Sequence, residues 1–238
     1  MTEGRASSDQ PVHGPAAARR SMLLWDLPTR IVHWLIALLA PFSWWSASHD
    51  HLPWHRLSGY TVLGLLVFRL IWGFAGGGGA RFAGFLRGPR EVLAYLRGRR
   101  AAFLGHNPLG GWSVAAMLAA LVLQVGLGLF SVDEDGLEAG PLARFVTFAA
   151  GRAIARIHHL TFWLLVGLVA LHLAAIGFYE LRGARITLPM ITGRALLAEG
   201  SSPPRPARLA SFLLAAAVAL AVAWFVAHGL RLRPGTAI

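Results

Sequence analysis

The sequence predicts an all-α integral membrane protein, a four-helix bundle with one additional C-terminal transmembrane helix. Of its 238 residues, 55% are hydrophobic and only 14% are charged, whereas ordinary soluble domains carry about 25% charged residues. The mean hydropathy is +0.55. Long apolar stretches recur along the chain, and a bilayer core of about 30 Å needs roughly 20 apolar residues per helix. The chain is therefore expected to reside in lipid.

Five apolar stretches are expected to span the membrane: residues 31–48, 55–75, 112–131, 157–179 and 209–229. Pro41 should kink the first of them, because proline removes a backbone hydrogen bond inside a helix. Trp44 and Trp45 fit an aromatic anchor at the membrane interface. Residues 89–99 predict a short helix on the inner surface, with Pro89 at its first position and arginines among its apolar residues.

Composition excludes several classes of protein. All 22 basic residues are arginines, and the formal net charge is +11. A basic stripe on a soluble face would suggest nucleic acid as a partner, but these arginines fall between apolar runs, so we expect membrane lipid and no nucleic acid. The chain has no cysteine, which excludes disulfides, iron–sulfur clusters and covalent haem attachment. Any redox cofactor would have to be held by histidine.

The arginines also predict the orientation, because short basic loops stay on the cytoplasmic side. Between the second and third spans the only acid is Glu91, and the arginines are Arg81, Arg87, Arg90, Arg97, Arg99 and Arg100. The segment after the fourth span, two crossings further on, is also rich in arginine. The connection between the third and fourth spans carries the acids Asp133, Glu134, Asp135 and Glu138. We therefore expect the N-terminus inside and the C-terminus outside.

Composition also suggests four segments. Residues 1–22 lack an apolar run and are rich in small residues, so we expect a disordered cytoplasmic tail there. Residues 23–195 would form the four-helix domain, and the proline-rich residues 196–208 a linker. Residues 209–230 would form the extra transmembrane helix.

Among the histidines inside or at the ends of the expected spans, where ionisable side chains are costly and usually functional, four lie at matching depths and faces. His158 and His172 lie fourteen positions apart on the fourth span. At about 100° per residue they point to within ~40° of each other and are ~21 Å apart along the helix. Given the topology, His33 of the first span shares the inner level with His172, and His55 of the second span shares the outer level with His158.

Two facing pairs of imidazoles in a four-helix bundle suit two haem b groups, bound non-covalently with two histidines on each iron. Such a site has no open position for oxygen or substrate, so its chemistry would be electron transfer. Arg69 follows His55 by the same fourteen positions, and Arg30 precedes His33 by three. Either arginine could pair with the propionates of the inner haem.

Simpler interpretations stand beside this one. A lone histidine near a helix end is usually an interfacial residue, and His159, thirteen positions before His172, points elsewhere. The run "HDH" at 49–51, with His55, resembles a metal cluster. His106 in "LGHNPLGG" is either a loop cap or part of a quinone pocket.

The chain resembles the bacterial cytochrome b561 family, which includes the b-type cytochrome subunits of nickel–iron hydrogenases. The resemblance covers roughly residues 23–195 and rests on "WDLPTRIVHW", "WHRLSGYTVLGLLVFRLIWG", "LGHNPLGG", "HHLTFWLLVGLVALH" and "PMITGR". It implies four core helices and two b haems, with axial histidines on the first, second and fourth helices. On this sequence those ligands are His33, His55, His158 and His172. It also implies a bacterial inner membrane, in which the orientation predicted from the arginines makes the N-terminus cytoplasmic and the C-terminus periplasmic.

Three functions follow as alternatives. The first is a dihaem carrier in a respiratory chain, passing electrons between membrane quinol or an enzyme partner and a periplasmic redox protein such as a c-type cytochrome. Whether it would oxidise quinol itself is left open. The second is a cytochrome b anchor subunit for a periplasmic hydrogenase or another oxidoreductase. The third, of another class, is a haem-free transporter or structural membrane protein.

Overall fold

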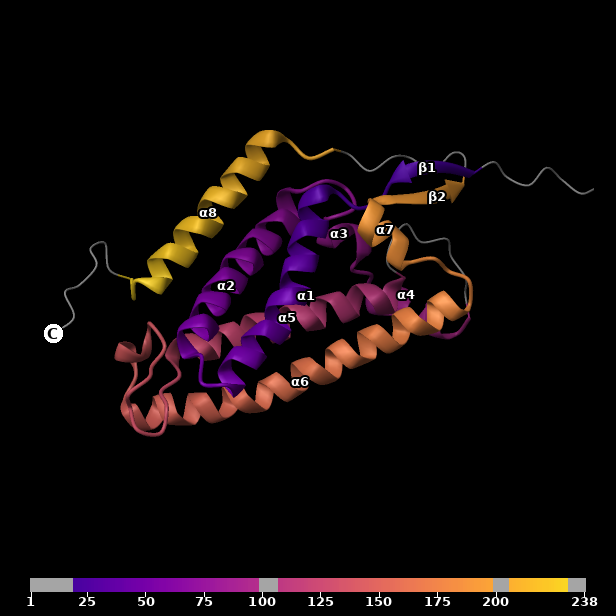
Figure 1. Ribbon diagram of the computed structural model, residues 1–238. Coiled ribbons are helices and arrows are strands. Elements are labelled where there is room, and N and C mark those ends of the chain that lie inside the picture. The colour runs from indigo at the N-terminus through magenta and orange to yellow at the C-terminus, as the bar shows by residue number, and fades with distance from the viewer. Residues whose placement is uncertain (1–18, 99–106, 199–205, 231–238) are drawn as a thin grey trace, which may run out of the picture.

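The computed structural model describes residues 19–98, 107–198 and 206–230 of the chain. Five helices in it are long and apolar enough to cross a membrane: α1 (Leu27–Ser48), α2 (Leu52–Ala75), α5 (Pro108–Phe130), α6 (Phe148–Leu181) and α8 (Leu209–Ala227). The prediction of an all-α membrane protein with five spanning helices is confirmed. Figure 1 shows these helices side by side, with α6 and α8 on opposite sides.

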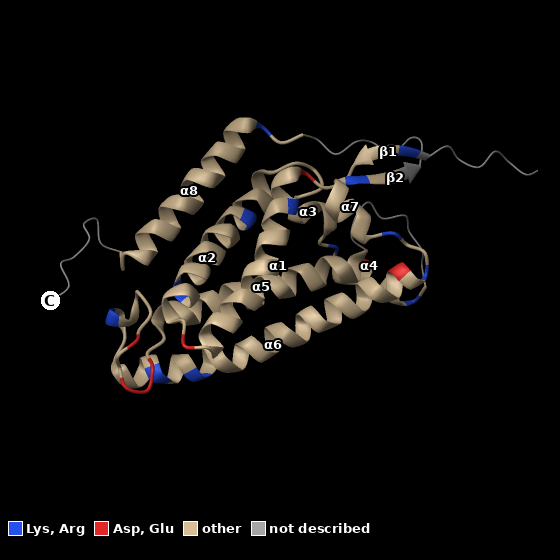
Figure 2. Cartoon of the chain, in the orientation of Figure 1, with Lys and Arg blue, Asp and Glu red and all other residues tan. Residues whose placement is uncertain are grey.

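The remaining elements are short and lie outside the spans. They are β1 (Arg19–Leu23), α3 (Phe82–Phe85), α4 (Pro89–Leu96), the 3₁₀ helix η1 (Ala143–Phe145), α7 (Thr187–Thr192) and β2 (Arg194–Ala198). Helix α4 agrees with the predicted surface helix. Charged side chains gather near the two ends of α6, and the middle of that helix carries none (Figure 2). This distribution suits a helix whose middle lies in lipid.

Local sequence signals set the helix ends. Asp26 accepts a hydrogen bond from the backbone N–H of Thr29, and Asn107 accepts one from that of Gly110, at 2.9 and 2.7 Å. Both are side-chain N-caps of the usual kind. Helices α1, α2, α4 and α5 all carry proline in their first turn, where its missing N–H costs nothing. Helix α1 continues through Pro41 to Ser48.

Helix α6 begins nine residues earlier than the predicted span, at Phe148, and is 34 residues long. The predicted span of residues 157–179 did not include Arg152 and Arg156. In the structure Arg152 pairs with Glu134 of the preceding loop at 3.1 Å. The first turns of α6 therefore lie at the level of the charged loop. The apolar content of the sequence alone underestimates the length of this helix.

Of the segments predicted from composition, the tail and the linker have boundaries that differ from the structure. The tail was expected to be disordered to residue 22, but β1 pairs antiparallel with β2, with Arg19 opposite Ala198 and Leu23 opposite Arg194. Strand β2 likewise extends into the predicted linker of residues 196–208. A ladder between such distant segments leaves no local sequence signal, which is why composition missed it. Residues 1–18 and 199–205, the rest of the tail and part of the linker, lie outside the described residues.

Helix α8 packs closely along α2 (Figure 1). A buried cluster joins α1, α2 and α8 through Val32, Phe68, Trp72, Ala80, Ala215 and Ala219. A Cβ built on Gly64 of α2 would lie 3.4 Å from the Cβ of Ala223 of α8. Small residues at this interface let the two backbones approach, as in other membrane helix pairs. Helix α8 is therefore packed into the same core as α1 and α2.

This packing makes a prediction about stability. Ala219 is 5% exposed, so an Ala219→Leu substitution should overpack the α2–α8 interface and destabilise the protein by about 1–3 kcal/mol. Thermal unfolding of the detergent-solubilised protein would measure the change. The Ala221→Leu variant is a matched control, since Ala221 is exposed on the same helix. Equal melting temperatures for the two variants would contradict a packed α8.

Candidate functional site: two histidine pairs

The predicted outer pair, His55 and His158, is brought together by α2 and α6. The centroids of the two imidazole rings are 6.3 Å apart, and the ring planes are inclined at 82°. Two imidazoles that bind one metal ion from opposite sides, with metal–nitrogen bonds of about 2 Å, have centroids about 6 Å apart. The observed separation matches that arrangement.

Both rings are held by a carbonyl of a neighbouring helix. The Nδ1 of His55 lies 2.8 Å from the backbone oxygen of Ser43 on α1, and the Nδ1 of His158 lies 2.9 Å from that of Gln124 on α5. A carbonyl oxygen can only accept, so in each ring Nδ1 carries the proton. The Nε2 lone pair of His55 is then available to a metal, whereas that of His158 accepts a hydrogen bond from the Gln124 amide, which a metal would have to displace. A hydrogen bond from Nδ1 to a carbonyl is usual for metal-binding histidines.

The same test separates these histidines from two others. The Nδ1 atoms of His49 and His228 also lie near carbonyl oxygens, those of Trp45 and Trp224. Each of these carbonyls belongs to the histidine's own helix, four residues back, and such a bond orients the ring along that helix's surface. Among the histidines that the structure describes, only His55 and His158 have such a bond to the carbonyl of another helix.

The side chain of His158 also depends on its neighbours on α5. The Nε2 of Gln124 lies 3.3 Å from the Nε2 of His158, and the hydroxyl of Thr161 donates to Oε1 of Gln124 at 2.5 Å. A Cβ added to Gly128 would lie 3.1 Å from Cε1 of His158. Glycine at this position therefore makes room for the ring. No sequence pattern indicated this contact between Gly128 and His158.

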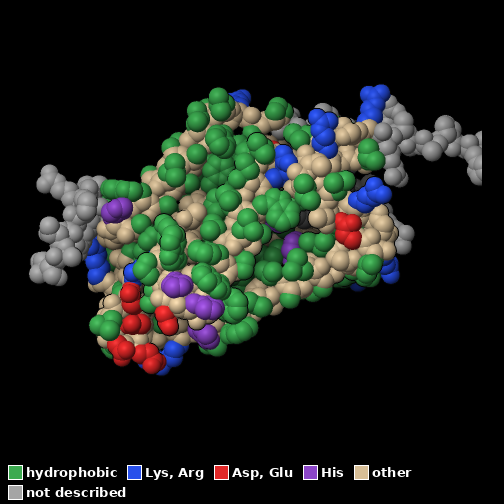
Figure 3. All heavy atoms as spheres, in the orientation of Figure 1, with side chains coloured by type: hydrophobic (Ala, Val, Ile, Leu, Met, Phe, Trp, Pro, Cys, Tyr) green, Lys and Arg blue, Asp and Glu red, His purple; other side chains and the backbone are tan. Residues whose placement is uncertain are grey.

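The predicted inner pair consists of His33 of α1 and His172 of α6, both of them partly buried. The Nδ1 of His33 is buried and has no hydrogen-bond partner among the described residues. The ring of Trp34 meets that of His33 edge-on at 5.1 Å. All four candidate histidines are partly buried, whereas His49, His51 and His159 are exposed. Figure 3 shows one histidine recessed among hydrophobic side chains.

The two predicted arginines also carry buried donors without a partner. They are Nε of Arg30 and Nη1 of Arg69. Arg69 is 7% exposed, and its guanidinium lies 5.0 Å from the centroid of the Phe82 ring. Arg30 donates through Nη1 to the backbone oxygen of Ile191, just before β2. Buried donors without acceptors are rare in folded proteins, and a carboxylate would satisfy both.

Helix α6 packs closely along α5 but approaches α1 and α2 far less. Near the outer level Trp44 of α1 stacks on Phe162 of α6, with centroids 6.2 Å apart. Gly59, one turn after His55 on α2, has no heavy atom within 4 Å of an added Cβ. His55 and His158 therefore meet across a part of the bundle where α6 is not in close contact with α1 and α2.

At the inner end of α6 a hydroxyl cluster joins three elements. The hydroxyl of Tyr179 lies 3.1 Å from that of Tyr95 on α4, and Nδ2 of Asn107 donates to it at 2.8 Å. The hydrogen bond to Tyr179 raises the pKa of the Tyr95 hydroxyl, which is therefore protonated at neutral pH. Tyr179 follows His172 by seven residues, or two helical turns, so the cluster lies beyond the inner histidine pair.

The other candidate ligands do not assemble. Among the described residues, no three histidines or acids are grouped in a way that could hold a metal ion, which includes the "HDH" run at 49–51. Arg56 forms an ion pair with Glu138, so part of the acidic outer loop is tied to α2. His106 lies outside the described residues.

Five spanning helices and histidines facing each other across helices define a multi-pass membrane protein with a candidate cofactor site. The family described as prokaryotic cytochrome b561 matches residues 24–193, well over half of the chain. The chain belongs to the prokaryotic cytochrome b561 family. No curated protein and no solved structure matches it significantly.

Membership makes the chain a membrane b-type cytochrome that takes part in electron transfer, and a b-type haem is the cofactor it implies. The residues present fit that group. The two imidazoles of His55 and His158 lie at a separation suited to one iron, each with its Nδ1 on a carbonyl, and buried arginine donors lack an acceptor. The chain has no cysteine, so attachment must be non-covalent.

Proposed function

We propose that this protein carries electrons across the bacterial inner membrane through two haem b groups. His55 and His158 would bind one iron, and His33 and His172 the other. The observation that carries the proposal is the outer pair: two rings 6.3 Å apart, each with Nδ1 facing a carbonyl of another helix.

The residues of the chain have separate roles in this proposal. The carbonyls of Ser43 and Gln124 fix the protonated nitrogen and the direction of the outer rings, which raises the basicity of the nitrogens facing the metal. Arg30 and Arg69 would pair with propionates at the inner level. When bound, haem supplies a one-electron couple. With two histidines on each iron, no coordination position is left for oxygen or substrate.

The path would cross most of the membrane. His158 and His172 are fourteen residues apart on the continuous helix α6, which corresponds to ~21 Å along its axis. The arginine-rich segments support a cytoplasmic N-terminus and a periplasmic C-terminus. The outer pair would then exchange electrons with a periplasmic redox protein such as a c-type cytochrome, and quinol or an enzyme partner would be the other partner.

Haem content tests the proposal most directly. The purified protein should contain two haems per chain, with low-spin b-type absorption bands that sharpen on reduction. A pyridine haemochrome assay against total protein gives the ratio. A colourless preparation would overturn the proposal, and one haem per chain would overturn its dihaem form.

Transfer across the membrane needs a second measurement. Vesicles containing the protein and trapped ferricyanide should reduce the ferricyanide when a quinol is added outside. Empty vesicles are the control. If ferricyanide were reduced only after co-purified oxidoreductase subunits were added, the protein would be an anchor subunit of that enzyme. If neither quinol nor these subunits led to reduction, the proposed electron transfer across the membrane would be wrong.

A further inference from the structure

Helix α4 carries two adjacent faces of different chemistry. Pro89, Val92, Leu93 and Leu96 are spaced as one helical face and, with Trp112 of α5, line a shallow hollow of about 440 Å³. Arg90, Leu93, Ala94 and Arg97 line a second hollow of about 380 Å³. Leu93 belongs to both, so an apolar surface and a basic surface meet along one helix.

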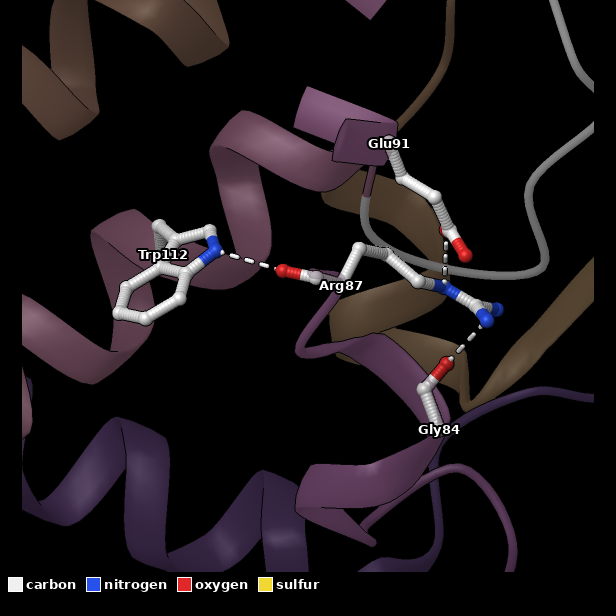
Figure 4. Close-up of polar contacts among 4 residues, drawn as sticks. All are labelled: Gly84, Arg87, Glu91 and Trp112. Carbon is white, nitrogen blue, oxygen red and sulfur yellow. Dashed lines mark hydrogen bonds and ion pairs between the residues drawn. The ribbon is translucent and has the colours of Figure 1, made fainter. Parts of the chain in front are cut away.

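The two arginines of this surface are uncompensated. Arg90 and Arg97 are exposed, and neither pairs with an acid among the described residues. The nearby acid, Glu91, instead pairs with Arg87 at 3.7 Å (Figure 4). The basic hollow therefore offers two guanidinium groups, seven residues or about 10 Å apart along the helix, to an anion supplied from outside.

The apolar face is equally uncovered. Leu93 is 46% exposed, Leu96 62% and Trp112 50%. The indole Nε1 of Trp112 donates to the backbone oxygen of Arg87 at 2.9 Å, which fixes α5 to the segment leading into α4 (Figure 4). With the Tyr95–Tyr179 contact, this bond holds α4 at the end of the bundle where α5 begins and α6 ends.

That end of the bundle is where a membrane surface would lie. A short helix with apolar side chains on one face and arginines beside them lies in the plane of the interface, with the apolar face toward acyl chains and the guanidinium groups among headgroups. Tryptophan favours the same depth. A free anion would leave the apolar hollow exposed, and a neutral lipid would leave both arginines without a partner.

We propose that α4 and Trp112 form a binding site for one anionic phospholipid, with the headgroup phosphate between Arg90 and Arg97 and an acyl chain against Leu93 and Leu96. The site lies apart from the histidine pairs, so it does not depend on the proposed electron transfer. Its ligand is defined by two features together, a negative headgroup and an attached hydrocarbon chain.

The test compares lipids on the delipidated holoprotein in detergent. Native mass spectrometry should show that the protein retains phosphatidylglycerol in preference to phosphatidylcholine. Because two charges near the headgroup are lost, the R90Q/R97Q variant should bind phosphatidylglycerol about tenfold or more weakly. The R208Q variant is the matched control and should keep the preference, since Arg208 is exposed but lies before α8.

Three results would overturn the site. They are equal retention of the two lipids by the unmodified protein, an unchanged preference in R90Q/R97Q, and equally tight binding of soluble glycerol phosphate. The last would indicate a free-anion site. The L96S variant should weaken phosphatidylglycerol binding and leave the arginines intact. Unchanged absorption bands in every variant show that each has folded.

Discussion

Replacing His55 by alanine should remove one haem of two and leave the other bound. His55 would supply half of the ligands of the outer iron, and its ring is 6.3 Å from that of His158. Its loss leaves a single imidazole, whereas His33 and His172 on the inner level are untouched. The haem-to-protein ratio should fall by about half, and the remaining bands should stay low-spin because bis-histidine ligation is retained there.

The controls come from the same helices. His159→Ala should keep both haems, since His159 adjoins His158 on α6 but is exposed. His33→Ala should also lose one haem, and the double variant His33→Ala/His55→Ala should lose both. If His55→Ala and His158→Ala removed different haems, distinguishable by their reduced bands, the pairing would be wrong.

Helix periodicity was sufficient for much of the candidate site. The fourteen-residue spacing of His158 and His172 placed both on one face of α6. Because successive helices cross the membrane in opposite directions, His55 was predicted to lie near His158, and His33 near His172. The structure brings the His55 and His158 rings together, and the pairing of His33 with His172 stays a prediction. Helix α6 carries both His158 and His172, so the helical period alone relates the directions of their side chains.

Contacts between helices could not be predicted from the sequence. The carbonyl that orients His55 belongs to Ser43, twelve residues earlier on another helix. Every residue has a carbonyl, so no residue type signals it. The bond from Arg30 to Ile191 and the pairing of β1 with β2 also involve backbone groups, so no residue type indicates them either. What a sequence pattern can reveal is which face a side chain occupies, and these contacts depend on which backbone lies opposite.

The ends of the helices also differ in how well the sequence predicts them. The end of α8 was predicted to within two residues, because only its own apolar run defines it. The start of α6 was missed, because its first turns lie at the level of the charged loop, where Arg152 pairs with Glu134. Polar residues near a span can be judged correctly only when their partners are known.

Gly128→Val should disrupt the outer haem without changing a ligand. A Cβ at this position would lie 3.1 Å from Cε1 of His158, and the two further methyl groups of valine have no room beside the ring. The imidazole would have to turn away from α5, which breaks its bond to the Gln124 carbonyl and misdirects Nε2. We expect the outer haem to lose its low-spin bands or to be lost altogether.

Gly126→Val is the control for this substitution, because it is two positions away on α5 and nothing lies within 4 Å of its added Cβ. Both substitutions place a β-branched residue in the same helix, so any general cost to α5 is shared. Reduced-minus-oxidised spectra of the two variants, normalised to protein, separate the effects. Equal spectra would mean that the ring of His158 is not confined by α5, and the carbonyl of Gln124 would then have no role in directing it toward iron.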